Sequence, residues 1–441
     1  MSTDRSFIKN SFITFTRQIS NIVIGMLLLS VLGKYLGDEG FGDYTLLTLF
    51  PTVLLTFLTL GVNTSTIYFV SRKEVDLNTV FNNNIIIGTL LSIISVFVGL
   101  VAVIFFSEQL FKDTPLSLVY LSLLAVPFLF LREYFQTVFQ GLQDFKAFNT
   151  LMVQNQLSIL SFAVIFVIFL DYGLKGALSA FILGNAITVI TMIYKLVRHH
   201  SVSFKWNSFS WEYFKKSVNY GLKAHVSNFA SFLNYRTVVF ILGYFSTGNA
   251  AVGRYSAAMN LGERLSIFAV SFSSVLYPKI SSTNSEEDRN RITSIVSRNV
   301  FLITIIMAMV AFVLSDFIVY TIFNKSFTET PLLLKIMLPG FALLAVEKVL
   351  SNDIAGRGKP ELNMWLSIYN VIFNVILNLF MVPAFGVIGA AISTTITYFF
   401  SFILKIIIFK RLTGEGYLNF LLVKKSDFLI YKTLLQKLRA R

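Results

Sequence analysis

Long apolar stretches separated by short polar connections run along the whole chain. About twelve of them are close to the roughly twenty residues that an α-helix needs to cross the hydrocarbon core of a bilayer. We expect the spans at 11–33, 44–70, 82–106, 115–140, 148–170, 174–196, 219–245, 252–278, 294–322, 331–355, 361–384 and 387–409. Backbone groups in lipid must be hydrogen-bonded internally, so the pattern predicts an all-α integral membrane protein.

The second half of this pattern resembles the first. LGKYLGDEGFGDYTLL at 32–47 corresponds to LGYFSTGNAAVGRYSAA at 242–258, and DYGLKGALSAFI at 171–182 corresponds to AFGVIGAAISTT at 384–395. The matched residues lie 210 to 213 positions apart and are Gly33 and Gly243, Gly42 and Gly253, Tyr44 and Tyr255, Gly173 and Gly386, and Gly176 and Gly389. Shared turn chemistry is the alternative explanation for paired glycines. The near-constant offset favours two pseudo-symmetric six-helix lobes around a central cavity.

The interpretation as two six-helix lobes divides the chain into four segments. The N-terminal lobe is expected at 1–196, a basic cytoplasmic linker at 197–218, and the C-terminal lobe at 219–411. Residues 412–441 alternate leucines with lysines and arginines, which is typical of an amphipathic helix on the anionic inner leaflet. Two parallel repeats that rock against each other around a central site give alternating access, the usual mechanism of a transporter.

The chain carries a formal net charge of +14, and the distribution of this charge indicates its orientation. Lysines and arginines concentrate in every second connection, beginning with Arg72 and Lys73 and including the linker. Such connections mark the cytoplasmic side, so both termini are expected inside the cell. The basic excess therefore orients the protein, and we expect no nucleic acid partner.

Composition also narrows the chemistry. The chain has no cysteine and three histidines, which excludes thiolate metal sites and disulfides and leaves little material for any metal. It lacks a Walker A sequence and a nucleophile elbow, and its expected outer connections are short. A glycan polymerase or ligase would need a larger outer domain. We therefore expect no enzyme, no cofactor and no metal.

Polar residues lie at helical spacing within several spans and predict a hydrated interior surface. The cationic candidates for binding an anionic substrate are Arg17, Lys223 and Arg236, because arginine suits phosphate. The polar residues expected to line the cavity are Asn21, Asn155, Asn234, Asn370 and Asn374. For each cation the alternative is a side chain that reaches the membrane interface, above all for Lys223 near the end of its span.

Acidic residues are fewer. Glu263, beside Arg264, either neutralises Arg236 in a structural ion pair or carries a coupling proton, and we favour the ion pair. Glu133, Glu347 and Asp353 are expected at solvated cytoplasmic ends of their spans. Arg132, Arg298 and Lys348 are expected at the membrane interface.

Four stretches resemble one family across nearly the whole chain. They are LGKYLGDEGFGDYTLLTLFPTVLLTFLTLGVNTSTIYFVS at 32–71, ALSAFILGNAIT at 177–188, GRYSAAMNLGERLSIFAVSFSSVLYPKIS at 253–281 and GVIGAAISTTITY at 386–398. They are similar to bacterial polysaccharide flippases of the Wzx type, which export O-antigen. That family belongs to a superfamily with lipid II flippases and MATE multidrug exporters.

The resemblance implies a multi-pass protein of the bacterial inner membrane. Such flippases move undecaprenyl-pyrophosphate-linked oligosaccharides, the repeat units of O-antigen in lipopolysaccharide or of related polysaccharides, from the cytoplasmic to the outer face. Cationic cavity residues would engage the pyrophosphate, and Arg17, Lys223 and Arg236 lie at suitable positions. Membrane lipids and H⁺ or Na⁺ are the other partners implied. The alternative function is an ion-coupled multidrug exporter of the MATE type.

Overall fold

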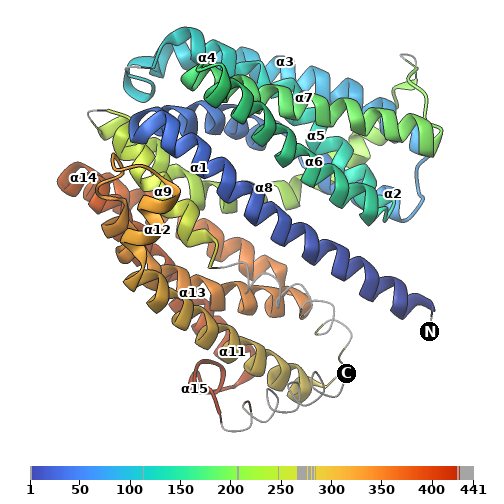
Figure 1. Ribbon diagram of the computed structural model, residues 1–441. Coiled ribbons are helices and arrows are strands. Elements are labelled where there is room, and N and C mark those ends of the chain that lie inside the picture. Colours follow the sequence, from blue (N-terminus) through green and yellow to red (C-terminus); the bar gives the residue numbers. More distant parts are fainter. Residues whose placement is uncertain are drawn as a thin grey trace, which may run out of the picture. The chain divides into compact units, whose positions relative to one another are not determined.

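All the secondary structure of the described residues is helical (Figure 1). The computed structural model describes residues 2–424 and 427, except 113, 206, 207, 247, 266–275, 277–279, 281, 282 and 284; side chains are described from residue 18, except at 223, 224 and 227. The helices are α1 (Ser2–Leu58), α2 (Val62–Ser71), α3 (Leu77–Leu110), α4 (Leu116–Leu123), α5 (Ala125–Gly141), α6 (Phe145–Ala163), the π-helix η1 (Val164–Phe169), α7 (Gly173–His200), α8 (Trp211–Phe245), α9 (Ala250–Glu263), α11 (Glu286–Val313), α12 (Ser315–Ile322), α13 (Thr330–Gly356), α14 (Pro360–Thr413) and α15 (Leu418–Leu421).

The expected spans overlap these helices, but three of them, 115–140, 148–170 and 294–322, each contain two consecutive helices. We expected breaks near 34–43 and 385–386, and at both places α1 and α14 consist of two helices that meet at a residue with non-helical backbone angles. Each kink lies at a glycine with positive φ, Gly37 at 69° and Gly386 at 58°. The expected span 44–70 is instead interrupted at Gly61, where φ is 72°. Of the span expected at 252–278, residues 266–275, 277 and 278 lie outside the described part.

Seven segments in the described part are long and apolar enough to cross a membrane. They are Gln18–Leu58, Leu77–Leu110, Leu116–Gly141, Phe145–Phe169, Gly173–His200, Glu286–Val313 and Pro360–Thr413. The first and last contain 41 and 54 residues, and a single crossing needs about twenty. The protein is therefore a multi-pass membrane protein, and the number twelve stays a prediction.

Polar residues at the helix ends explain where several helices begin. Asp76, Asp144, Ser210 and Ser285 each precede a helix and accept a hydrogen bond from a backbone N–H three residues later. Such a cap satisfies one of the N–H groups that a helix start leaves without a partner. These four caps open α3, α6, α8 and α11 at connections expected on the cytoplasmic side.

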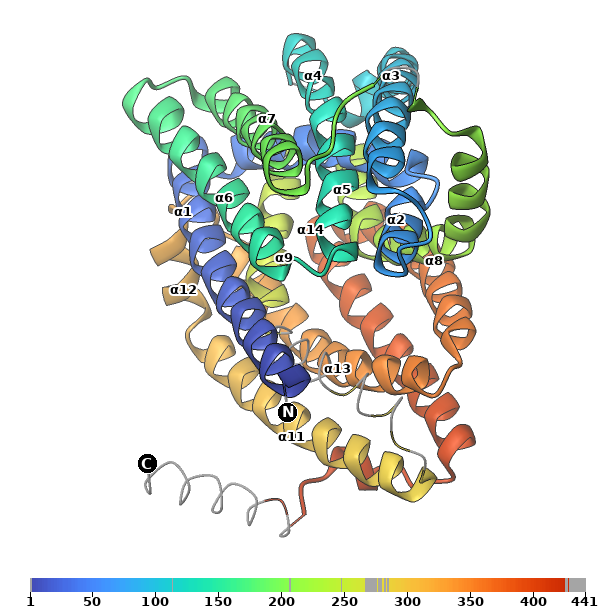
Figure 2. The same ribbon diagram turned by 90° about the vertical axis from the view of Figure 1, so that its right-hand side faces the viewer.

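The chain forms two compact units. The first contains Met1–Ser256 with Tyr320–Phe327, and the second contains Ala257–Val319 with Thr328–Arg441. In the first unit α6 packs against α1 and α7, and α5 packs against α2, α3 and α7 (Figures 1 and 2). In the second unit α13 packs along α11 and α14. An internal repeat and a packed unit are different divisions, so the lobe boundaries expected from the repeat stay a prediction.

Two glycine pairs of the repeat have similar local environments. Gly173 and Gly386 both have positive φ, 50° and 58°, and each lies where the chain turns between two helices. Three residues later, Gly176 and Gly389 bring their helices against a preceding carbonyl, at Phe166 and Met381. An added Cβ would lie 2.9 Å from the oxygen of Phe166 and 2.1 Å from that of Met381. The same residue types therefore perform the same local function 213 positions apart.

Candidate functional site

One of the three cations expected to bind the substrate has a described side chain. Arg236 is half-buried on α8 in the first unit. The side chains of Arg17 and Lys223 lie outside the described residues. The central cavity expected between the lobes, and the pairing of Arg236 with Glu263, stay predictions.

Two expected cavity residues present unsatisfied acceptors inside the first unit. Asn21 on α1 and Asn234 on α8 are half-buried, and the Oδ1 atom of each is enclosed without a hydrogen-bond partner among the described residues. Buried polar atoms in folded proteins are almost always hydrogen-bonded to protein or water. These two oxygens can therefore accept hydrogen bonds from water or from a ligand.

A guanidinium forms the centre of a polar cluster among α5, α6 and α7. Arg132 Nη1 donates to Asn155 Oδ1 at 3.2 Å and to Asn185 Oδ1 at 2.5 Å. Asn155 Nδ2 donates to Thr188 Oγ1 at 3.1 Å, and Asn185 Nδ2 donates to the Phe181 carbonyl at 2.7 Å. That second bond fixes the amide orientation, because a carbonyl only accepts. Arg132 is thus held by neutral oxygens, and its Nε is buried without a partner in the described part of the chain.

The carboxylate beside Arg132 is directed to other partners. Glu133 Oε1 accepts from Asn63 Nδ2 at 3.1 Å, and its Oε2 accepts from Gln136 Nε2 at 2.5 Å. The pair Arg132 and Glu133 is electrostatically favourable. The hydrogen bonds nevertheless place the guanidinium on the asparagine side of α5 and the carboxylate on the α2 side.

In the second unit a ladder of asparagines lies between the two halves of α14. Asn370 Nδ2 donates to Ser401 Oγ at 2.8 Å, and Asn374 Nδ2 donates to Thr397 Oγ1 at 3.1 Å. Asn378 continues the series one turn later, and all three side chains are buried with 4%, 2% and 0% exposure. The expected cavity residues Asn370 and Asn374 therefore make their described contacts within one helix pair.

Glu263 and Arg264 lie at the end of α9 in the second unit. Both are half-buried, and Arg264 Nε is enclosed without a described hydrogen-bond partner. Lys348 on α13 interacts electrostatically with Glu263. The choice between a structural pair and a coupling proton for Glu263 stays open.

Two carboxylates expected in solvent are instead enclosed in the second unit. Asp353 has no exposed surface and accepts hydrogen bonds from Thr293 and Arg357. Glu347 has a side chain 14% exposed and lies 3.2 Å from Lys405 Nζ. The expectation was wrong because α11 and α14 pack against this end of α13, which the spacing along one helix does not reveal.

A pair of polar contacts joins the kinked region of α1 to α9 within the first unit; we call it the α1–α9 clasp. Asp38 Oδ2 accepts from Arg254 Nε at 2.7 Å. Asp43 Oδ1 accepts from Asn249 Nδ2 at 2.6 Å and from the Thr114 hydroxyl. The repeat relates Asp38 to Asn249 and Asp43 to Arg254 at one offset of 211 residues. The counterparts of the two residues in one contact thus form the other contact, which is the pattern of an interface with two-fold symmetry.

Two matched glycines lie at the centre of the clasp. An added Cβ at Gly42 would lie 1.9 Å from the carbonyl oxygen of Asn249, and one at Gly253 would lie 1.8 Å from that of Asp38. No larger residue fits between these backbones, so the clasp depends on glycine in both repeats.

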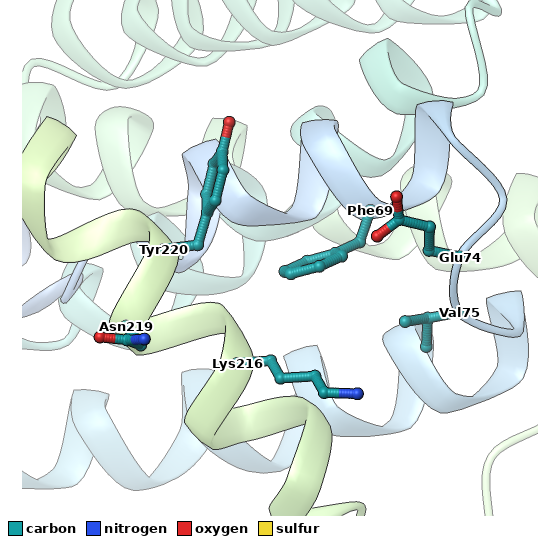
Figure 3. A pocket seen from close by; sticks show the side chains of 6 residues that line it. All are labelled: Phe69, Glu74, Val75, Lys216, Asn219 and Tyr220. Carbon is teal, nitrogen blue, oxygen red and sulfur yellow. The ribbon is translucent and has the colours of Figure 1, made fainter.

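A cavity of about 560 Å³ opens at the start of α8. It is lined by Phe69, Glu74, Val75, Lys216, Asn219 and Tyr220. Figure 3 shows Phe69 and Lys216 entering the cavity from opposite sides, while the Asn219 side chain points away. The Tyr220 ring stacks on Tyr68 with centroids 4.3 Å apart. The hydrogen bond between Lys216 and Glu212 raises the pKa of Lys216 and lowers that of Glu212. Both groups are therefore charged at neutral pH.

Arg132, Asn185 and Lys405 were missed as site residues. The internal repeat could have indicated part of this polar cluster. Thr188 and Ser401 lie 213 residues apart, and each accepts a hydrogen bond from an asparagine of the preceding helix. Nothing along α5 itself distinguishes Arg132 from an interfacial arginine.

These features define an all-helical, multi-pass membrane protein. The fold is similar to that of the lipid II flippase MurJ in an inward closed conformation, with a TM-score of 0.76 at 17% identity, covering 91% of this chain and 87% of that one. It is also similar to an inward-facing MATE family multidrug transporter, with a TM-score of 0.73 at 16% identity and coverage of 90% and 94%. At these identities the likeness establishes the fold.

The chain belongs to the polysaccharide biosynthesis protein family, whose model matches residues 7–284. A putative O-antigen transporter of Shigella flexneri is 22% identical over 89% of this chain and 94% of its own length. A probable low-salt glycan biosynthesis flippase, Agl15 of Haloferax volcanii, is 24% identical over 49% of this chain and 48% of its own. The resemblance identified from the sequence is confirmed, and it extends to archaeal proteins.

Proposed function

We propose that the protein is a flippase that moves a polyprenyl-pyrophosphate-linked oligosaccharide from the cytoplasmic to the outer face of the membrane by alternating access. The family match and the names of its relatives, a glycan flippase and an O-antigen transporter, support this class of cargo. Undecaprenyl pyrophosphate and a surface-polysaccharide repeat unit are the carrier and cargo that we expect. We also propose that the protein is not an enzyme, that it lies in the bacterial inner membrane, and that both of its termini are in the cytoplasm.

The observation that carries the proposal is the setting of Arg132. Arg298 and Arg357, in the second unit, are bound to the carboxylates of Asp427 and Asp353. Arg132 instead binds the neutral oxygens of two asparagines. A charge inside a membrane bundle is costly, and neutral acceptors do not cancel it. The neighbouring Glu133 attracts Arg132, but the hydrogen bonds described for its two oxygens come from Asn63 and Gln136 and not from the guanidinium. The positive charge of Arg132 therefore favours binding of an anion. A guanidinium can donate two hydrogen bonds to the paired oxygens of pyrophosphate.

The test uses proteoliposomes that contain the purified protein and a short-chain polyprenyl-pyrophosphate oligosaccharide. We expect Arg132→Gln to slow flipping about tenfold or more, since a hydrogen bond to a charged group is worth ~1.5–3 kcal/mol. Arg198→Gln removes an exposed arginine at the end of α7 and should leave the rate unchanged. The double variant Arg17→Ala/Arg236→Ala tests the two other arginines in the same assay.

Efflux of an organic cation is measured beside glycolipid movement. Cation efflux without glycolipid flipping would contradict the proposal and identify an exporter of the same fold. Flipping that is equally fast in wild type and Arg132→Gln would remove Arg132 from the site while leaving the transport class intact.

A further inference from the structure

The inside of the second unit contains a closed hydrogen-bonded ring around one ion pair. Lys405 Nζ lies 3.2 Å from Glu347 Oε1 and donates to Asn363 Oδ1 at 2.7 Å. Asn363 Nδ2 donates to the Ser351 carbonyl at 2.8 Å, and the Ser351 hydroxyl donates to Glu347 Oε1 at 2.9 Å. Glu347 and Ser351 lie on α13, and Asn363 and Lys405 lie on the two halves of α14. The ring therefore joins three helical segments through one carboxylate.

Both charges of the ring are withdrawn from solvent, but to different degrees. The Lys405 side chain is 2% exposed and the Glu347 side chain is 14% exposed. An ionisable residue inside a membrane bundle is costly and commonly marks an ion or proton pathway. The carboxylate is thus the member of the pair that a proton can reach.

Glu347 also has fewer hydrogen-bonding and ionic contacts than Asp353 and Asp427, two other enclosed carboxylates of the second unit. Asp353 receives Thr293 and two nitrogens of Arg357, while Asp427 receives two nitrogens of Arg298. Glu347 has one ammonium and one hydroxyl, and the contacts described for it all fall on Oε1. Its Oε2 is the atom at which a proton can be added without breaking a described hydrogen bond.

The other charged groups that the described residues place near Glu347 also have partners. Lys348, the next residue on α13, interacts electrostatically with Glu347 and with Glu263 of α9. On α11, Arg298 is bound to Asp427 and Arg289 is bound to Glu286. Lys405 is the cation that α14 places against Glu347.

We propose that Glu347, paired with Lys405, is the proton-binding site through which a proton gradient acts on this transporter; the inference rests on the proposed transport function. A proton added to Glu347 cancels its charge and leaves the buried Lys405 ammonium against neutral oxygens alone, Asn363 Oδ1 and the uncharged Glu347 Oε1. Removing one partner of a buried pair leaves an uncompensated charge, so the protonated state disfavours this packing of α13 on α14. Proton binding and the arrangement of the second unit are thereby linked.

The main test compares the wild type with Glu347→Gln/Lys405→Met, which removes both charges and keeps similar volumes. Glycolipid flipping is measured in proteoliposomes with and without an imposed pH gradient. We expect the gradient to accelerate the wild type, and we expect the double variant to keep its gradient-free rate and lose the acceleration. Glu361→Gln, an exposed carboxylate at the start of the same helix α14, is the matched control and should keep it.

Infrared difference spectroscopy of the purified protein supplies a readout that needs no cargo. The protonated-carboxyl band that forms on acidification should be present in wild type and Glu361→Gln and absent in the double variant. A double variant that retains gradient acceleration, or a wild type that flips cargo with no response to the gradient, overturns the inference. A wild type that flips no glycolipid but shows the band, lost in the double variant, refutes the proposed function and leaves the proton site standing.

If the double variant fails to insert in the membrane, the variant Glu347→Asp replaces it in the test. It keeps the charge and withdraws the carboxylate from Lys405, so the pH midpoint of the acceleration should shift. An unchanged midpoint would overturn the inference.

Discussion

At the residue scale, the partner of each buried charge separates structural from functional candidates. Asp353 and Arg357 bind each other directly, with 0% and 5% side-chain exposure, and Arg357 also binds Glu286 and Asn290. Every strong donor and acceptor there is used, which is the mark of a structural pair. Arg132 and Glu347 lack such saturation, and for that reason they carry the two proposals.

A first prediction concerns the structural pair. Asp353→Asn removes the buried carboxylate and leaves the enclosed Arg357 guanidinium with Glu286 as its acidic partner, so we expect the free energy of unfolding to fall by about 1.5–3 kcal/mol. Thermal unfolding of the purified protein in detergent measures this loss. Glu361→Gln, at an exposed carboxylate, should leave the melting temperature unchanged, and an equal melting temperature for both variants would contradict the assignment.

At the element scale, glycines set the geometry in two distinct ways. At Gly173 and Gly386 the requirement is backbone conformation, because φ is positive and nothing lies within 4 Å of an added Cβ. At Gly42 and Gly253 the requirement is space, because backbone atoms occupy the position of the Cβ. The repeat therefore conserves two kinds of physical constraint and not merely a residue type.

The second prediction separates these two constraints. Gly173→Ala and Gly386→Ala should each lower stability by about 1–3 kcal/mol, the strain of a positive-φ backbone conformation that residues with a Cβ rarely adopt. Gly253→Ala should be far more damaging, because its Cβ would meet the Asp38 carbonyl at 1.8 Å. Gly416→Ala is the control, with open space and no positive φ, and should be neutral. Melting temperatures in detergent provide the measurement, and equal losses at Gly253 and Gly386 would refute the distinction.

At the scale of the whole molecule, the expected orientation follows from the basic connections. Lys73, between α2 and α3, and Lys359, between α13 and α14, lie in connections expected inside the cell. Lys325, between α12 and α13, lies in one expected outside. All three residues are exposed in the structure, so a label can reach each of them from its own side.

A third prediction tests this orientation directly. The chain has no cysteine, so each single-cysteine variant carries one unique label site. In intact cells a membrane-impermeant maleimide should label Lys325→Cys but neither Lys73→Cys nor Lys359→Cys. Permeabilised cells should allow all three. Labelling of Lys73→Cys in intact cells would reverse the predicted topology.

The sequence alone determined the all-helical membrane class, the positions of most helices, the internal repeat and the family. These properties depend on local quantities, namely the length of apolar runs, the spacing of polar residues and a constant offset between matched glycines. Such quantities can be recognised in the sequence, because each span by itself must match the thickness of the bilayer and satisfy its own backbone hydrogen bonds.

The tertiary structure decided which polar groups meet. Arg132 lies 23 residues before Asn155 and 53 before Asn185, and Glu347 lies 58 before Lys405. The sequence gives the helix face of each residue, but the rotation and depth at which two helices pack come from contacts spread along their whole length. For this reason Asp353 and Glu347 were expected in solvent, whereas the packing of α11 and α14 against α13 encloses them.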